Sequence, residues 1–580
     1  MQDKKNLLIV ILTCAVMWLG VDLWLKPYQS KSDTPSIGTA ITPGSDGPER
    51  SSRGVLTGAF DGSSGISDSP SDAMIVFHNE KISGFLDLRG AVVRNCILKD
   101  YKKTTDADSP PVEMLSENGK GYGACFGWAK PTGQQMDLPD SQTLWKASHA
   151  ELTPEQSTTL SWSNTDGVSF FIDLSIDDQY VISIKQRVEN NSDHSVDPGA
   201  PMSALIRQGP VETSGYMMLH EGAIGMADGK LQEKTYKDLG KAGQGPWMHF
   251  TGPKYDETNS SSGWLGITDK YWLAALIPNS HCNGRFVAKG LNVNTPALYK
   301  VEIQDNDSGT IQPGSSKTYE PSRLFLGPKK VSLLEDYEKK LHIDHFDMAV
   351  DFGWFYFITK PMFILLSSLQ KMVGNFVLAI LIMTIAIKIV FFPLSARSFR
   401  AMSRMRLLQP QIQALKSRFG DDKVRLNQSM MDLYKREKIN PVSGCLPMIV
   451  QIPILFALYK VLFISIELRH ASFFGWISDL SAPDPTSLFS GFGLLPWTLP
   501  AWLHIGIWPI LMGVTMVVQQ MMNSSSITDS QQKIMLTYVM PILFTGMMAQ
   551  FPVGLVIYWT WSNFLTIAQQ WFMMRYHQSV

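Results

Sequence analysis

The sequence predicts a β-sandwich domain followed by an α-helical membrane domain, and two patterns carry this prediction. From about Ala73 to Gly327, apolar and polar residues alternate with period two between turns rich in Gly, Pro and Asn. From Ile534 to Met574 there is no Asp, Glu, Lys or Arg, which allows two membrane spans of about 20 residues each. The net charge of −1 and the 44% hydrophobic content are averages over these two unlike parts.

Residues 1–26 are expected to form an uncleaved transmembrane signal anchor. The apolar run Asn6–Leu25 follows Lys4 and Lys5, and bulky Trp and Leu residues stand where a cleaved signal peptide would have small ones. Residues 27–72 consist mostly of Ser, Gly, Thr, Pro and Asp. They cannot bury enough apolar surface to offset chain entropy, so they are predicted to be a flexible linker.

Residues 73–345 are predicted to form a large antiparallel β-sandwich, or super-sandwich, that ends in a helix. Apolar side chains alternate with Ser and Asp along Val168–Ile176, Asp178-Gln179 turns the chain, and the alternation resumes along Tyr180–Val188. Repeated strands that are separated by such turns are typical of β-sandwiches. Between Val331 and His345 the period becomes helical.

Residues 346–374 are predicted to form an amphipathic helix lying in the membrane interface, because aromatic residues and lysines flank an apolar centre along Trp354–Val373. Residues 375–574 are predicted to form a five-helix transmembrane core, followed by a short cytoplasmic tail at 575–580. With the anchor, this makes six spans. The five spans of the core are expected at Asn375–Phe392, Cys445–Ile466, Ile505–Met522, Ile534–Gln550 and Gly554–Met574.

The charge of the loops predicts the orientation. Between Pro393 and Pro441 there are 11 Lys and Arg against four Asp and Glu, whereas Glu467–His504 carries one Arg against three acidic residues. The positive-inside rule therefore places a helical hairpin, residues 394–440, in the cytoplasm. It places both termini in the cytoplasm as well, and the β domain on the outer side of the membrane.

Polar side chains recur at helical spacing within the predicted spans, so they would share faces of a bundle that encloses a polar groove. Lys388 is the only charge in its span, and at the bilayer centre it would cost roughly 2.5–3.5 kcal/mol unless it faced such a groove. Alternatively, Lys388 lies close enough to Pro393 to snorkel to the interface, and single Thr or Gln residues serve as interhelical hydrogen bonds. The candidate groove residues are Lys388, Thr384, Gln451, Thr515, Gln519, Asn563, Thr566 and Gln570.

Two other surfaces each allow a structural and a functional interpretation. The methionines of the spans, among them Met512, Met516 and Met547, either pack the core or form an adaptable surface for varied partners. A basic stripe on the hairpin is either a solvated face or a docking site for anionic lipid headgroups, ribosomal RNA or acidic protein segments. Its residues are Arg397, Arg400, Arg404 and Arg406.

The sequence contains no pattern that predicts an enzyme. There is no H-E-x-x-H, no G-x-S-x-G, no catalytic cysteine arrangement and no pair of intramembrane acids for a proton relay. His342 and His345 have metal-compatible spacing but no convincing third ligand. The five cysteines form no C-x-x-C pair, and those of the β domain are expected to be buried free thiols. We therefore expect no catalytic residue, metal or cofactor.

Six short segments of the predicted membrane half contain distinctive sequence motifs. They are Phe392-Pro393-Leu394, Met402–Pro410, Gly444–Pro447, Gln451–Ile454, Pro509–Met516 and Phe551–Trp559. These segments resemble the YidC membrane protein insertase family, in its bacterial inner-membrane form with a large periplasmic domain. In the outer domain, Gly263-Trp264 and Tyr271-Trp272 are similar to the family pattern, so the resemblance covers essentially the whole chain.

The resemblance implies a five-helix core around a hydrophilic groove that is closed to the outside and open to the cytoplasm and lipid. Thr384 and Trp559 match the family's polar threonine and last-helix aromatic residue. Lys388 stands where the family usually has arginine, so the charge is kept but the planar guanidinium is not. The residues that match an apolar slide for substrate helices are Leu455, Met512, Met547, Tyr558 and Trp559.

The predicted function is therefore that of an insertase and chaperone for newly made inner-membrane proteins, acting alone or with the Sec translocon. The expected partners are nascent membrane proteins, the translocon and its accessory subunits, the ribosome or signal recognition particle pathway, and anionic lipids, but not DNA. Two other functions stay open at this point. One is a solute transporter or channel, although no internal repeat is detected. The other is an envelope assembly scaffold that acts through the β domain.

Overall fold

The structure is a computed structural model of the full chain. It describes residues 57–58, 73–115, 122–130, 136–209, 219–227, 229–241, 248–251, 263–279, 282, 285–291, 298–305, 307–353, 356–419, 422–437, 446–489, 504–523 and 530–577. The predicted anchor (1–26) lies outside the described residues, as do nearly all of the predicted linker (27–72) and the last residues of the predicted tail.

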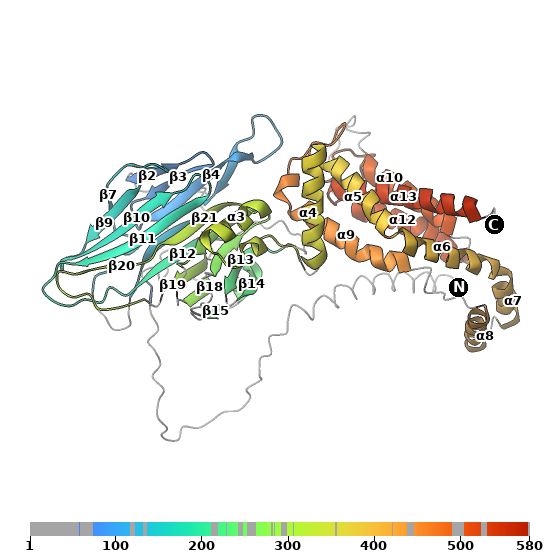
Figure 1. The fold of residues 1–580 in the computed structure, drawn as a ribbon, viewed down its shortest axis with the longest axis horizontal. Helices are drawn as coiled ribbons and strands as arrows, with labels where there is room; N and C mark the ends of the chain where they lie inside the picture. The colour runs from blue at the N-terminus through green and yellow to red at the C-terminus, as the bar shows by residue number, and fades with distance from the viewer. Residues whose placement is uncertain are drawn as a thin grey trace, which may run out of the picture. The chain divides into compact units, whose positions relative to one another are not determined.

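Two large sheets form the N-terminal part of the described chain (Figure 1). The first runs in the order β15 (Met248–Thr251), β18 (Arg285–Leu291), β19 (Leu298–Gln304), β12 (Ala200–Gln208), β6 (Tyr122–Lys130), β4 (Val92–Lys102), β3 (Ile82–Asp87), β2 (Met74–His78) and β8 (Glu151–Leu152). In addition, β1 (Thr57–Gly58) pairs with β6, and β5 (Pro111–Met114) pairs with β4.

The second sheet runs in the order β14 (Lys230–Thr235), β13 (Gly222–Ala227), β16 (Trp264–Thr268), β17 (Trp272–Ile277), β21 (Ser322–Pro328), β11 (Val181–Asn190), β10 (Val168–Ile176), β9 (Thr158–Ser163) and β7 (Lys146–Ala147). A short strand, β20 (Ser316–Thr318), also pairs with β11, and a short helix, α2 (Tyr236–Lys241), follows β14. Among the described strands every pairing is antiparallel except that of β2 with β8. The prediction of a large, mainly antiparallel β domain is confirmed.

The hairpin of β10 and β11 shows how the sequence builds this domain. Val168 pairs with Asn190 and Ile176 with Ile182, so the register is continuous over the whole of β10. Every second residue of β10, starting at Val168, is buried. The turn begins at Asp177, whose carboxylate accepts hydrogen bonds from the backbone N–H groups of Gln179 and Val181. This hairpin was predicted from the alternation, and the structure confirms it.

Aromatic side chains join the two sheets. Trp128 of β6 and Phe170 of β10 are both fully buried, and their rings meet edge to face with centroids 5.0 Å apart. The Trp128 ring also stacks with the ring of Trp145, at a centroid distance of 6.3 Å. The described cysteines, Cys96, Cys125 and Cys282, are buried and free, as the sequence predicted. Burial raises the pKa of the Cys125 thiol to about 12, so it stays protonated.

A helix closes the β domain. Helix α3 (Val331–Leu341) directs Tyr337 onto the β10–β11 turn, where its hydroxyl donates to Asp177 Oδ2 at 2.6 Å and accepts from the Tyr180 N–H. The 3₁₀ helix η2 (Phe346–Ala349) follows, and the Phe346 ring packs edge-on against Phe325 of β21. The helix predicted at the end of the sandwich is therefore integrated into its core.

The C-terminal part is helical (Figure 1). The longer helices are α4 (Tyr356–Val373), α5 (Phe376–Val390), α6 (Phe392–Leu407), α7 (Gln409–Phe419), α8 (Lys423–Arg436), α9 (Leu446–Ile464), α10 (Ile507–Asn523), α12 (Met540–Met548) and α13 (Val553–His577). Shorter turns are η4 (Ile466–Leu468), α11 (Ser530–Ile534) and the π-helical η7 (Met535–Val539). Helix α13 packs against α10, α5 and α9, while α4 packs against α5 and α9.

Helices were predicted at each of the five core spans, and the structure has helices there. Among the described residues, no single helix is both long and apolar enough to cross a membrane. One bent pair, Phe376–Val390 with Phe392–Met405 at an angle of 61°, meets that length and composition together.

Several polar contacts connect the β domain, and the segment that follows it, with the helices. Lys360 of α4 lies 2.6 Å from Asp347, and Lys460 of α9 lies 2.7 Å from Asp351. Beyond α9, the Arg469 guanidinium donates to the Lys102 carbonyl at 2.6 Å. The two acidic residues are thus paired with cations of the helical part, which compensates for their desolvation.

Neighbouring phenylalanines give a test of the sandwich core. Phe170→Ala should lower the free energy of unfolding by about 3–5 kcal/mol, because it opens a cavity between the two sheets. Phe171 points to the other face of β10, where its ring lies 4.0 Å from the Arg187 guanidinium. Phe171→Ala should therefore cost only about 1 kcal/mol. Urea unfolding of a β-domain fragment, followed by near-UV circular dichroism, measures both; equal losses would contradict the assigned faces.

Candidate functional site

A cavity of about 340 Å³, lined by both polar and apolar side chains, lies among five helices of the C-terminal part. It is formed by the second half of α5, the first half of α6, the first half of α9, the second half of α10 and the middle of α13. Its lining residues are Thr384, Ile387, Lys388, Phe391, Leu394, Ser395, Ser398, Phe399, Met402, Gln451, Ile452, Ile454, Leu455, Met516, Gln519, Gln520, Asn523, Tyr558, Trp559, Asn563, Thr566 and Gln569. The cavity therefore lies toward the end of the bundle at which α6 to α8 emerge.

One face of α13 supplies hydrogen bonds to three other helices. Ser562 Oγ accepts from Gln451 of α9 at 3.3 Å, and Thr566 Oγ1 accepts from Lys388 of α5 at 2.8 Å. The Asn563 amide donates to Thr515 of α10 at 3.2 Å. One turn further, the Gln570 amide donates to Asn523 of α10 at 2.8 Å. We call these four α13 residues, Ser562, Asn563, Thr566 and Gln570, the polar ladder.

Lys388 is the only charged residue in the described lining of this cavity, which contains neither Asp nor Glu. Its ammonium group donates to the neutral hydroxyl of Thr566. The hydroxyl group of Thr384, one helical turn earlier, donates to the Ile380 carbonyl of its own helix at 2.6 Å. Lys388 therefore lies in the lining of this cavity and is hydrogen-bonded to α13.

The predicted groove residues divide into two groups. Lys388, Thr384, Gln451, Gln519, Asn563 and Thr566 line the cavity. Thr515 and Gln570 are not in the lining, but each is hydrogen-bonded to a residue that is: Thr515 to Asn563, and Gln570 to Asn523. Gln570 is only 3% exposed, and its sequence neighbour Gln569 lines the cavity instead.

The predicted apolar slide is also divided. Leu455, Tyr558 and Trp559 line the cavity, and the Trp559 ring packs against Phe544 of α12. Met512 does not reach the cavity: it is fully buried in the core, one helical turn before Met516, which does line it. Met547 is 45% exposed on α12 and lies outside the lining.

Helix α6 has two faces, of which the sequence predicted only one. Arg397, Arg400 and Arg404 are exposed; the side chain of Arg406 lies outside the described residues. The opposite face, with Ser395, Ser398 and other residues at helical spacing, lines the cavity. The helical spacing of Ser395 and Ser398 could have indicated this second face. The prediction considered only the basic stripe. Gln520, Asn523 and Gln569 also line the cavity without having been predicted.

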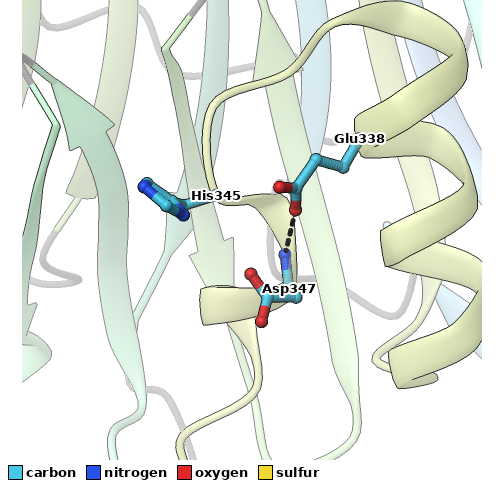
Figure 2. A group of neighbouring side chains, drawn as sticks. All are labelled: Glu338, His345 and Asp347. Carbon is cyan, nitrogen blue, oxygen red and sulfur yellow. Dashed lines mark hydrogen bonds between the residues drawn. The ribbon is translucent and has the colours of Figure 1, made fainter.

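A second cluster of polar groups lies at η2. Ligand-type atoms of Glu338, His345 and Asp347 come within 4.8 Å of one another, and the Glu338 carboxylate accepts from the Asp347 backbone N–H (Figure 2). However, Asp347 is already paired with Lys360 at 2.6 Å. A cation here would have to displace that ammonium group, so the cluster fits a structural junction. His342, the other predicted histidine, is not part of it.

The comparisons with known proteins agree over the whole chain. A family described as YidC periplasmic domain matches residues 74–365, and one described as 60Kd inner membrane protein matches residues 368–579. The chain is 41% identical over 580 residues to the membrane protein insertase YidC of Granulibacter bethesdensis, covering 99% of this chain and 98% of the relative. It is 45% identical over 503 residues to that of Beijerinckia indica, covering 85% and 80%.

Among solved structures, the chain is similar to an active YidC insertase crystal structure in which the first transmembrane domain is resolved. The identity is 16%, and the alignment covers 86% of this chain and 92% of that one. The TM-score is 0.34.

A double-mutant cycle tests the polar ladder. Asn563→Ala and Thr515→Val should show a coupling of roughly 0.5–1.5 kcal/mol, as expected for an interhelical hydrogen bond in a membrane protein. The matched control pairs Asn563→Ala with Thr560→Val, because the Thr560 hydroxyl donates to Val556 of its own helix. That cycle should show no coupling. Unfolding in mixed micelles provides the free energies, and equal coupling in both cycles would contradict the assigned contact.

Proposed function

This chain belongs to the YidC family of membrane protein insertases, and we propose that its cavity receives polar segments of newly made inner-membrane proteins from the cytoplasm. The observation that carries the proposal is the lysine, together with neutral polar side chains, in a cavity at the hairpin end of an otherwise apolar bundle. A polar group in hydrocarbon costs several kcal/mol when it is unsatisfied. A hydrated cavity part of the way through the bilayer would lower that cost for a client segment.

The proposed topology has six spans: the anchor, α5, α9, α10, the α11–η7–α12 segment and α13. Apolar side chains exposed on the described helices among these spans support a lipid-facing surface, since such patches are rare on soluble proteins. Examples are Ile382, Ile385 and Ile389 of α5 and Val514 of α10. The basic hairpin would face the cytoplasm and the β domain the periplasm. Helix α4, with exposed Phe357 and Met372, would lie in the interface.

In the proposed mechanism a client's polar tail enters beside Lys388, while its apolar segment contacts Leu455, Tyr558 and Trp559 and leaves into lipid. Within a low-dielectric bundle, an ammonium group attracts a carboxylate more strongly than it does in water. Lysine supplies this attraction as a point charge without the bidentate geometry of arginine. The site would therefore favour acidic tails without requiring a fixed carboxylate orientation.

The exposed arginines of α6 support a further role for the hairpin. We propose that this face meets anionic lipid headgroups, the ribosome or the signal recognition particle pathway on the cytoplasmic side. The Sec translocon and its accessory subunits are proposed partners for clients that are too large to insert through the cavity alone. No enzymatic step is proposed, because the function needs only a favourable path for the client.

Reconstitution of the pure protein tests the function directly. Liposomes that contain the protein should insert a small single-span client, as measured by protection of its translocated tail from protease. The same liposomes should show no flux of ions or small solutes above that of empty liposomes. Flux without client insertion would instead identify a channel or transporter.

Substitutions of Lys388 test the role of its charge. Lys388→Arg should keep activity, and Lys388→Ala should impair clients with acidic tails more than neutral ones. Lys388→Glu should impair acidic clients most, because attraction becomes repulsion in a partly desolvated site. Insertion yields are compared for paired clients that differ only in tail charge, at matched protein levels. The control is Lys371→Glu, an exposed lysine of α4 outside the cavity. Equal yields across Lys, Ala and Glu at position 388 would refute the proposed role.

Deletion of the β domain tests whether the helical part is sufficient. A chain lacking residues 73–343 keeps Asp347 and Asp351, which pair with Lys360 and Lys460. It should therefore still insert the single-span client. A longer deletion, through residue 353, leaves both lysines without these partners and should lose activity or stability. Loss of insertion by a stably expressed 73–343 deletion would show that the β domain takes part in insertion.

A further inference from the structure

The loop between α9 and α10 forms a cap over the first turns of two helices. The carbonyl groups of Leu480 and Ala482 accept from the first N–H groups of α13, at 3.1 and 2.8 Å. Side-chain oxygens of Asp484 and Thr486 accept from the first N–H groups of α10, at 2.9 and 3.0 Å. These N–H groups have no partner within their own helices, so the loop supplies the bonds they need. The cap lies at the opposite end of α10 from the cavity.

The cap is also folded within itself. The Phe473 N–H donates to the Ile477 carbonyl at 2.9 Å, and the Leu480 N–H donates to the Ala471 carbonyl at 3.0 Å. The side chains of Ile477 and Leu480 are each 1% exposed. Gly475, with φ of +79°, makes the tight turn at the tip. These hydrogen bonds and buried side chains therefore hold the tip in one conformation.

This ordered tip presents apolar side chains to the outside. Phe474 is 88% exposed, and the neighbouring Trp476 is 46% exposed although its indole N–H donates to Asp484 at 3.2 Å. Leu488 and Phe489 are about half exposed on the same loop. Residues 471–489 contain no Lys, Arg or Glu. The two aspartates of this loop accept hydrogen bonds from N–H and O–H groups of the loop itself.

Helix α10, which follows this loop, also has an exposed apolar face. Along that helix the exposed apolar residues recur at spacings of three and four: Leu511, Val514, Val518 and Met521. If α10 spans the bilayer, as in the proposed function on which this inference rests, that face meets lipid. The tip then lies at the level where the span leaves the hydrocarbon. Aromatic side chains with a satisfied polar atom are typical of that level.

We propose that residues 471–489 are a lipid-anchoring loop, with Phe474 and Trp476 inserted into the interfacial region of the outer leaflet. The loop needs no charged partner, because it presents no exposed cation or unpaired carboxylate among its described side chains. Its fixed conformation means that little chain entropy is lost when the tip enters the membrane. Since the same loop caps α10 and α13, the anchor would set the height of both helices in the bilayer.

The test places an environment-sensitive fluorescent amino acid at position 474 of the full-length protein in phosphatidylcholine nanodiscs. The matched control carries it at Ser478, which is exposed and polar on the same loop. We expect emission at 474 to shift to shorter wavelength, and to be quenched by lipids brominated near the headgroup more strongly than emission at 478. The substitution is tolerable because the Phe474 side chain is almost wholly outside the packed loop.

Two results would overturn the proposal. One is water-like emission at both positions. The other is apolar emission at 474 that brominated lipids do not quench, since this would mean a contact with protein. Client insertion is measured in parallel with the same labelled proteins in liposomes. Normal insertion without lipid quenching would overturn only the anchor, whereas lipid quenching without insertion would support the anchor and overturn the proposed function.

Discussion

The arrangement of the helical part depends on one constraint, the polar ladder of α13. Four polar side chains on one face of a helix cannot be left without partners where water is scarce, because each unsatisfied group costs free energy. Gln451, Thr515, Lys388 and Asn523 supply those partners from α9, α10 and α5. The apolar surface alone would allow these helices to slide or rotate against one another. Specific hydrogen bonds fix their register, and the cavity is the space that this register leaves open.

The two ends of the helical bundle differ in the groups that surround them. At one end, residues of the α9–α10 loop bond to the first N–H groups of both α10 and α13. Gly506 lies so close to the Asp484 carboxylate that a Cβ atom there would come within 2.4 Å of it, so glycine is required for this cap. At the other end α5 passes at a sharp angle into α6, and polar side chains of α6, α9 and α10 surround the cavity. The cap and the cavity therefore lie at opposite ends of α10.

The sequence predicts those parts of the fold and of the candidate site that depend on a local pattern of apolar and polar residues. The β10–β11 hairpin follows from alternation, because one face must be buried and a shift by one residue would expose it. The polar face of α13 follows from helical spacing. The position of Lys388 could not be decided, because periodicity gives a face but not a neighbour. Met512 and Met516 share a face of α10, yet only the second reaches the cavity. The cap formed by Asp484 could not be foreseen, since it bonds to the start of a helix 24 residues further on.

The charges of the helical part reveal a division of roles. Lys360 and Lys460 lie against carboxylates at 2.6 and 2.7 Å, which is how a folded chain stabilises partly buried ammonium groups. Lys388 has only a hydroxyl group, in a lining whose described residues include no acid. A resident carboxylate would make the bundle more stable, but it would also neutralise the site. In the proposed mechanism the missing partner leaves the attraction available to a client's carboxylate, and the attraction would end when that client departs, so the site would return to its starting state without any chemical step.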